Sequence, residues 1–369
     1  MIKPLPYVEK IQPYIPGKPI KEVERQLGIK SCVKLASNEN PLGPSPKVIE
    51  ALEVFLSTPQ EIARYPEGSG YYLKNALCEY FEKRGIQITH DELILGNGSN
   101  EIIDIAVRTY IGVGDEAVMA KPSFVVYAMS VTAQGGIPIE VPLKDWRHDL
   151  REMLSKVNKK TKAIFIANPN NPTGTMNFED EFDEFMQNVP EGVLVVVDEA
   201  YYEYVTNLKY PDSIKYFKEG KDILILRTFS KAYGLAGLRI GYGIAKKEIV
   251  NEMNRIREPF NTNTLAQLAA EVALKDEEHL KKVIETNEAG KRYLYRELEK
   301  IPSIKYLPTE ANFIYIILPD NISSSEVFDF LLKNGVIVRP VGPNHLRVTI
   351  GLPEENEIFI EKFRKFFGG

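Results

Sequence analysis

The sequence predicts an α/β protein in which a mainly parallel sheet is sandwiched by helices, with a smaller α/β domain at the C-terminal end. Short apolar runs alternate with amphipathic stretches through the first two thirds of the chain, which is the rhythm of strands joined by crossover helices. Several runs are apolar without interruption, as strands buried on both faces of a parallel sheet are. After residue 263 the pattern changes to a long helical tract followed by shorter strands, which predicts a second domain.

The first segment, residues 1–45, is expected to be an extended arm. Eight prolines occur up to Pro46, and proline removes a backbone donor and interrupts regular structure. We therefore expect this arm to lie outside the regular core and to pack near the smaller domain.

Residues 46–263 are expected to form the large domain. Apolar residues between Leu73 and Phe81 repeat at the spacing of an amphipathic helix, and a second helix is expected at Glu179–Gln187. The strand candidates are Glu92–Leu95, Ala117–Ala120, Ile137–Val141, Ala163–Ala167, Val193–Val197 and Ile223–Leu226.

Residues 264–369 are expected to form the smaller domain. A long helical tract begins near Thr264 and runs toward Glu299. The further strands and helices expected are Phe313–Ile317, Ser323–Lys333, Val336–Val338, Leu346–Ile350 and Glu354–Phe367.

Composition excludes several classes of function. The net charge is −5 and no basic block stands out, which argues against a nucleic-acid partner. No apolar run approaches the roughly 18 residues of a membrane span, and the N-terminus lacks the apolar stretch of a secretory signal, so a cytoplasmic location is expected. Two cysteines form no disulfide framework, and the four histidines stand singly, so no metal is expected.

Polar residues follow four of the predicted strands, where ligands of open α/β sheets bind. Three of these segments are Asn168–Gly174, Asp198–Tyr201 and Thr228–Gly241, the last with a lysine, an arginine and several glycines. Taken alone, the first is also typical of a plain turn and the second of a helix cap.

The fourth segment is the glycine-rich turn Gly96–Asn100. Ser99 stands where it would cap a following helix, and the free N–H groups of such a turn suit an anion.

Together these segments resemble the fold-type I pyridoxal 5'-phosphate (PLP)-dependent aminotransferases of class I/II. Within that group, the sequence most resembles the histidinol-phosphate aminotransferases. The resemblance covers nearly the whole chain and is carried by SNENPLGPSP (37–46), RYPEG (64–68), GNGSNEII (96–103), NPNNPTG (168–174), DEAYYEY (198–204), TFSKAYGLAGLRIGY (228–242) and GVIVRP…LRVTIG (335–351).

The resemblance implies that Lys231 holds PLP as a Schiff base and then moves the proton of the reaction. It implies that Asp198 faces the pyridine nitrogen, while Asn171 and Tyr201 donate hydrogen bonds to the phenolic oxygen of the ring. Phe124 matches the aromatic residue that stacks on the ring, and Tyr127 competes with it for that role.

The resemblance also implies the groups that bind the cofactor phosphate. These are Gly98, Ser99, Asn100, Thr228, Ser230 and Arg239. Tyr65 matches a tyrosine that reaches the phosphate of a neighbouring subunit, which implies a homodimer with shared active sites.

Four residues are implied for substrate binding: Tyr14, Asn38, Arg339 and Arg347. The two arginines would bind the phosphate of histidinol phosphate and, in the other half-reaction, the carboxylates of glutamate or 2-oxoglutarate. One departure is the short segment Val341–His345, which is longer in many relatives and borders the substrate. An aromatic aminotransferase and a PLP-dependent threonine-phosphate decarboxylase are the alternative enzymes, and a PLP-binding sensor is the non-enzymatic alternative.

Overall fold

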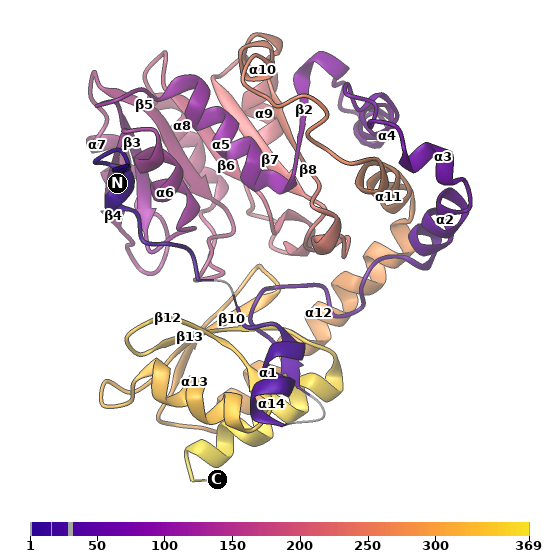
Figure 1. Ribbon diagram of the computed structural model, residues 1–369. Coiled ribbons are helices and arrows are strands. Elements are labelled where there is room, and N and C mark those ends of the chain that lie inside the picture. The colour runs from indigo at the N-terminus through magenta and orange to yellow at the C-terminus, as the bar shows by residue number, and fades with distance from the viewer. Residues whose placement is uncertain (1, 16, 29–31, 369) are drawn as a thin grey trace.

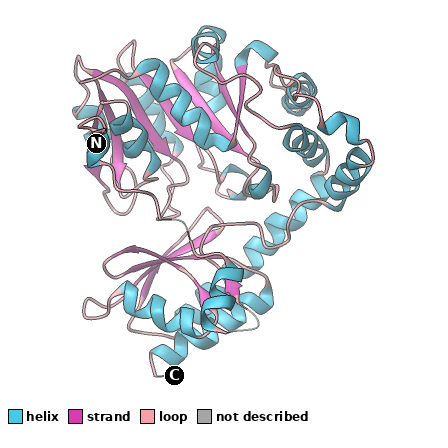
Figure 2. Ribbon diagram, viewed as in Figure 1, coloured by secondary structure: helices cyan, strands magenta, loops and turns pink. Residues whose placement is uncertain are grey.

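The structure is a computed structural model that describes residues 2–15, 17–28 and 32–368. Two layered bodies are joined by the long helix α12 (Glu277–Leu298), which runs from the larger body to the smaller one (Figure 1). In the larger body, helices cover both faces of a central sheet (Figure 2). Among the described residues, no helix combines the length and the apolar character needed to cross a bilayer.

The central sheet has seven strands in the order β2-β8-β7-β6-β5-β3-β4. All the predicted strands are present, with ends that differ by one or two residues. The strand that the prediction lacks is β8, which runs antiparallel to both of its neighbours, β2 and β7. The bounds are β2 Leu93–Gly96, β3 Glu116–Lys121, β4 Ile137–Pro142, β5 Thr161–Ala167, β6 Leu194–Asp198, β7 Ile223–Thr228 and β8 Gly241–Ala245.

Alternate side chains of the same strands enter two separate cores, one on each face of the sheet. On β6, for example, Val195 and Val197 pack into one core while Leu194 and Val196 pack into the other. The first face is covered by α2 (Pro46–Leu56), α4 (Tyr71–Glu82), α7 (Leu150–Ser155), α8 (Glu179–Asn188), α9 (Ser213–Lys218) and α11 (Thr264–Lys275). The second face is covered by α5 (Gly98–Tyr110), α6 (Val126–Ala133) and α10 (Lys247–Asn254).

The smaller body is built on an antiparallel sheet in the order β12-β13-β10-β9. Its strands are β9 Lys305–Leu307, β10 Phe313–Ile317, β12 Arg339–Gly342 and β13 His345–Thr349. The helices α13 (Ser324–Lys333) and α14 (Pro353–Phe366) pack with α12 over one core. The elements predicted for this region are therefore present, and β9 and β12 are added to them.

The N-terminal segment is more regular than the extended arm that its prolines predict. It contains the helix α1 (Ile20–Leu27), in which Val23 is buried, and the short strand β1 (Val33–Lys34). β1 pairs in parallel with β11 (Val336–Ile337) of the smaller body, but the short 3-10 helix η1 (Val8–Lys10) lies against α6 of the larger body. The segment therefore contacts both bodies.

The helical tract expected from Thr264 to Glu299 is two helices, because the chain turns at Asp276. The Asp276 carboxylate accepts hydrogen bonds from Ser45 and, at 2.9 Å, from Lys47. Helix α11 packs against α2 and α4 in the core of the larger body. The structure therefore places the boundary between the bodies at α12 and not at residue 264.

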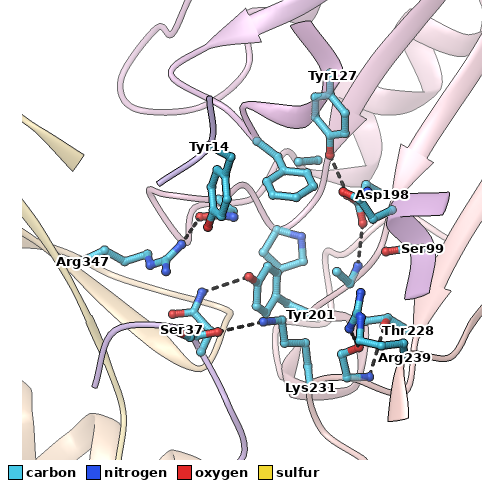
Figure 3. Close-up of a pocket in the computed structure, with 18 residues that line it drawn as sticks. Tyr14, Ser37, Ser99, Tyr127, Asp198, Tyr201, Thr228, Lys231, Arg239 and Arg347 are labelled. Atoms are coloured by element: carbon cyan, nitrogen blue, oxygen red, sulfur yellow. Dashed lines mark hydrogen bonds between the residues drawn. The ribbon is translucent and has the colours of Figure 1, made fainter. Parts of the chain in front are cut away.

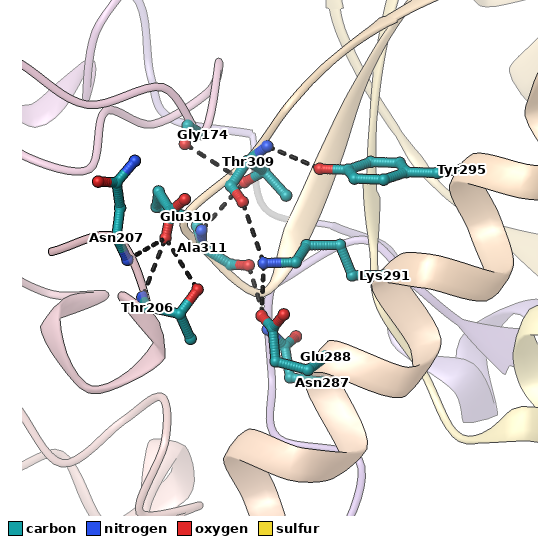
Figure 4. A network of polar contacts seen from close by, with 10 residues as sticks. All are labelled: Gly174, Thr206, Asn207, Asn287, Glu288, Lys291, Tyr295, Thr309, Glu310 and Ala311. Atoms are coloured by element: carbon teal, nitrogen blue, oxygen red, sulfur yellow. Dashed lines mark hydrogen bonds and ion pairs between the residues drawn. The ribbon is translucent and has the colours of Figure 1, made fainter.

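Residues 309–311 connect the bodies at the turn that follows β5 (Figure 4). The backbone oxygen of Gly174 accepts hydrogen bonds from the Glu310 N–H at 2.9 Å and from the Thr309 hydroxyl at 3.3 Å. The Glu310 carboxylate in turn accepts from the N–H groups of Thr206 and Asn207. This junction ties the Asn168–Gly174 segment to the smaller body.

Candidate active site

A cavity of about 220 Å³ lies at the carboxyl ends of β5, β6 and β7, between the two bodies (Figure 3). The order of the sheet reverses between β3 and β5, and a crevice forms at such a switch point. Most of the site residues predicted from the sequence line this cavity: Tyr14, Asn38, Ser99, Asn100, Phe124, Asn171, Asp198, Tyr201, Thr228, Ser230, Lys231, Arg239 and Arg347.

Three predicted residues lie outside the cavity lining. Gly98 lies directly behind it, since a Cβ on this residue would come within 2.5 Å of the Arg239 guanidinium. The guanidinium of Arg339 lies 5.5 Å from the centre of the Tyr14 ring, at the edge of the site. Tyr65 is 81% exposed and stacks on Phe260, with 4.7 Å between the ring centres.

The amine of Lys231 projects into the cavity from the turn after β7 (Figure 3). It donates a hydrogen bond of 3.0 Å to the backbone oxygen of Ser37. Burial lowers the pKa of Lys231 from 10.5 to about 7, and the positive charges of Arg347 and Arg239 act in the same direction. A substantial fraction of the lysine is therefore a neutral amine near pH 7.

The carboxylate of Asp198 ends β6 and is buried. Its Oδ1 accepts from the Ala200 N–H at 3.1 Å, and its Oδ2 accepts from the Tyr127 hydroxyl at 2.7 Å. Burial raises its pKa, while these two hydrogen bonds oppose the rise. The bond to Ala200 closes a local turn, and the next regular element is the 3-10 helix η3 (Tyr202–Tyr204).

The first turn of α5 and the segment after β7 form a cationic cup. Arg239 donates from Nη1 to the Ser230 hydroxyl at 3.0 Å, and Ser230 donates its N–H to the Thr228 hydroxyl at 3.1 Å. Helix α5 begins at Gly98, so Ser99 lies inside the first turn and does not cap the helix as expected. Free N–H groups, hydroxyls and a guanidinium in one place are suited to an anion.

Three hydrogen bonds at the cavity link the smaller body, the N-terminal segment and the larger body. Arg347 donates from Nη1 to Asn171 Oδ1 at 2.6 Å and from Nη2 to the Ala36 backbone oxygen at 2.7 Å. The Asn38 amide donates to the Tyr201 hydroxyl at 2.9 Å. The Asn171 amide nitrogen and the Tyr201 hydroxyl hydrogen are therefore left to donate into the cavity.

Sequence reasoning missed several groups that complete the site. Tyr127 was considered only as a stacking residue, yet its hydroxyl binds Asp198. The Ser37 backbone oxygen, which accepts a hydrogen bond from the Lys231 amine, cannot be recognised from side-chain type, although its neighbour Asn38 was predicted.

Among the described residues, no group of three or more histidine, cysteine or acidic residues is placed to hold a metal ion.

Comparisons with known proteins agree with this geometry. The family described as aminotransferase class I and II matches residues 30–363. A histidinol-phosphate aminotransferase of Moorella thermoacetica is 49% identical over 96% of this chain and 90% of its own length. Histidinol-phosphate aminotransferase 1 of Idiomarina loihiensis is 46% identical over 98% of this chain and 97% of its own.

Solved structures agree as well. The histidinol-phosphate aminotransferase of Sinorhizobium meliloti, crystallised in complex with pyridoxal-5'-phosphate, superposes with a TM-score of 0.87. It is 26% identical, and the match covers 98% of this chain and 97% of that one.

Proposed function

This chain belongs to the aminotransferase class I and II family, and we propose that it transfers an amino group between histidinol phosphate and 2-oxoglutarate. The observation that carries the proposal is one cavity that combines a partly buried lysine amine of lowered pKa, a buried carboxylate and two arginines from different bodies. Residues from both bodies contribute, so the whole chain is needed to build the site.

The cavity fits PLP, the cofactor of this family. A primary amine, a buried acid and an anion cup lie around one space, which matches the aldehyde, the ring nitrogen and the phosphate of that molecule. A Cβ on Gly98 would displace the Arg239 guanidinium, which forms part of the cup. When bound, PLP supplies an electron sink for the charge that develops when a substrate Cα loses its proton.

Lys231 is proposed as the catalytic lysine. Its lowered pKa provides the neutral amine that attacks a carbonyl carbon, and the same neutral amine then accepts the proton from the substrate Cα. The Ser37 carbonyl holds the amine on the cavity side.

The remaining residues bind and orient. In this proposal Asp198 holds a proton on the ring nitrogen, Asn171 and Tyr201 donate hydrogen bonds to the phenolic oxygen, and Phe124 covers the ring face. The groups proposed for the phosphate are Gly98, Ser99, Asn100, Thr228, Ser230 and Arg239.

Arg347 and Arg339 are proposed to bind the anionic groups of both substrates. They are direct partners across β12 and β13, so their side chains lie on the same face of the small sheet. Two adjacent guanidinium groups suit a phosphate dianion, and one suits a carboxylate. Tyr14, which packs against Arg339, and Asn38 are proposed to contact the rest of the substrate.

A homodimer with shared sites is part of the proposal. Tyr65 lies outside the cavity lining of its own subunit and is 81% exposed, so its hydroxyl is accessible to a second copy. Its stacking on Phe260 holds the ring at the surface.

A substrate panel tests the proposed reaction, with 2-oxoglutarate as the acceptor and histidinol phosphate, phenylalanine and tyrosine as donors. We expect histidinol phosphate to give the highest kcat/KM. A much higher kcat/KM for phenylalanine or tyrosine would establish the aromatic aminotransferase instead. Release of carbon dioxide from threonine phosphate, without glutamate formation, would establish the decarboxylase.

A further inference from the structure

Tyr127 lines the cavity, and its hydroxyl also contacts Asp198, the acid of the proposed site. It belongs to α6, is almost fully buried, and donates its hydroxyl hydrogen to Asp198 Oδ2 at 2.7 Å (Figure 3). A buried hydroxyl without a partner is costly, so Asp198 fixes the orientation of this hydroxyl.

The ring of Tyr127 is held on two sides, which fixes the direction of its hydroxyl. It stacks on Phe165 of β5, with 5.0 Å between ring centres and an angle of 15°. It also meets Phe124, the proposed stacking residue, edge to face at 5.5 Å and 85°. The same ring therefore orients both the acid and the aromatic cover of the site.

The charge on Asp198 depends on few groups. Burial and the neighbouring Glu199 disfavour the carboxylate, whereas the Tyr127 hydroxyl, the Ala200 N–H and the Lys231 charge favour it. The Ala200 bond goes to Oδ1, so Tyr127 is the donor to Oδ2. The Tyr127 hydroxyl, at 2.7 Å, makes the shorter of these two hydrogen bonds, and it favours the ionised form of the buried acid.

We propose that Tyr127 is a positioning residue whose hydroxyl decides where the proton shared by Asp198 and the cofactor ring nitrogen resides. A carboxylate that already accepts a phenol hydrogen bond is a weaker base, so it leaves that proton on the nitrogen. Without the hydroxyl, the proton moves toward the carboxylate. This inference rests on the proposed function, because it requires that PLP occupies the cavity.

The test is Tyr127→Phe, which keeps the ring and its two aromatic contacts and removes only the hydroxyl. The full-length protein is loaded with PLP labelled with ¹⁵N in the ring, and the ¹⁵N chemical shift reports protonation of the nitrogen directly. We expect the protonated value in the unsubstituted protein and a shift toward the unprotonated value in the variant. Affinity for PLP is expected to fall about tenfold, because a protonated Asp198 and an unprotonated ring nitrogen lose the charge pair that holds the cofactor ring.

Tyr216→Phe is the matched control. The Tyr216 hydroxyl also binds an aspartate, Asp183, but on α8 and away from the cavity. We expect it to leave both the ¹⁵N shift and the PLP affinity unchanged. Unchanged values in Tyr127→Phe as well would overturn the inference.

A second measurement needs no cofactor. The folded pKa of Asp198 is raised above its unfolded value, so the acid costs stability that grows as the pH rises from about 4. Tyr127→Phe raises the folded pKa further, so its urea midpoint, relative to the unsubstituted apoprotein, falls more at pH 7 than at pH 4. An equal difference at both values would mean that the hydroxyl has only a packing role.

Borohydride reduction and peptide mapping separate this inference from the proposed function. If the unsubstituted protein forms no reducible adduct with PLP at Lys231, the proposed function fails. If the adduct forms and the ¹⁵N shift is insensitive to Tyr127→Phe, only the role of Tyr127 fails.

Discussion

The amine of Lys231 lies where a charged group is unfavourable. It is enclosed between Arg347, Arg239 and the buried edge of the sheet, and its only direct hydrogen bond within the described residues goes to the Ser37 carbonyl. A site that needs a neutral amine thus gives up stability to obtain it, which is a common cost of catalytic groups.

Lys231→Met tests this cost in the apoprotein and is expected to raise stability while it abolishes transamination. The pKa of Lys231 in the folded protein, about 7, lies below its value of 10.5 in the unfolded chain. Below pH 7 the lysine is charged in both states, so its burial has its full destabilising effect. As the pH rises from 7 toward 10.5 this effect disappears. We expect a gain of about 1 kcal/mol at pH 6, since partial exposure screens the charge. Urea unfolding at pH 6 and pH 10 measures it, and an advantage that does not shrink at pH 10 would contradict the charge-based explanation.

At the scale of residues, the sequence predicted the groups that are chemically distinctive. A lysine with an arginine eight positions later, or an acid at the end of an apolar run, leaves a signal in residue type. The backbone oxygen of Ser37 does not, and the Tyr127 hydroxyl becomes informative only when α6 is placed beside β6. Contacts of this kind depend on tertiary packing.

Among the elements, the Asn168–Gly174 turn is shaped by the segment that crosses to it from the smaller body. Gly174 has φ of +73°, and a Cβ on it would come within 2.1 Å of the Thr309 hydroxyl oxygen and 2.9 Å of the Thr309 Cβ. The glycine therefore serves both the turn and the close approach of residues 309–311.

Gly174→Ala is expected to destabilise the protein and to weaken PLP binding, because the clash displaces the turn that carries Asn171. Gly192→Ala is the matched control: its φ is +78°, but nothing lies within 4 Å of the added Cβ. The control carries the backbone strain alone, about 1 kcal/mol, and Gly174→Ala should cost about 2 kcal/mol more. Urea unfolding of both variants measures the difference. Equal losses would show that the approach of Thr309 has no energetic consequence.

The elements that escaped sequence analysis share a physical reason. β8 (Gly241–Ala245) has two glycines and follows a glycine-rich loop, so it lacks the apolar run of its neighbours, yet it is buried between β2 and β7. The break at Asp276 lies inside an uninterrupted helical pattern and depends on hydrogen bonds to Ser45 and Lys47, more than 200 residues away in the chain. Local pattern cannot contain such long-range partners.

At the scale of the whole molecule, the two bodies meet at a site that neither contains alone. The larger body supplies Lys231, Asp198 and the phosphate cup, and the smaller body supplies Arg347. The sequence predicted a two-domain chain, but it placed the boundary at residue 264, because the helical pattern continues from α11 into α12. Only the packing of α11 on α2 and α4 assigns that helix to the larger body.

The proposed homodimer predicts that two inactive variants recover activity when they are mixed, which a monomeric enzyme would not do. If Tyr65 serves the cofactor phosphate of the partner subunit, Tyr65→Ala and Lys231→Ala damage different sites of a mixed dimer. The site that lacks Lys231 then also lacks the partner's tyrosine, whereas the other site keeps both groups. Mixing the two variants should therefore restore one intact site per mixed dimer, about a quarter of full activity when subunits combine at random.

The measurement is made after joint refolding, at a PLP concentration that does not saturate the Tyr65→Ala protein, so that each variant alone is nearly inactive. Light scattering checks the dimer mass. Tyr72→Ala is the control partner, since Tyr72 is also exposed, at 68%, but lies outside the cofactor motifs; mixed with Lys231→Ala, it should lower the activity only in proportion to dilution. If Tyr65 instead served its own subunit, both sites of the mixed dimer would be defective and no activity would return. Recovery thus depends on the tyrosine crossing between subunits, because no arrangement within one chain separates the two defects.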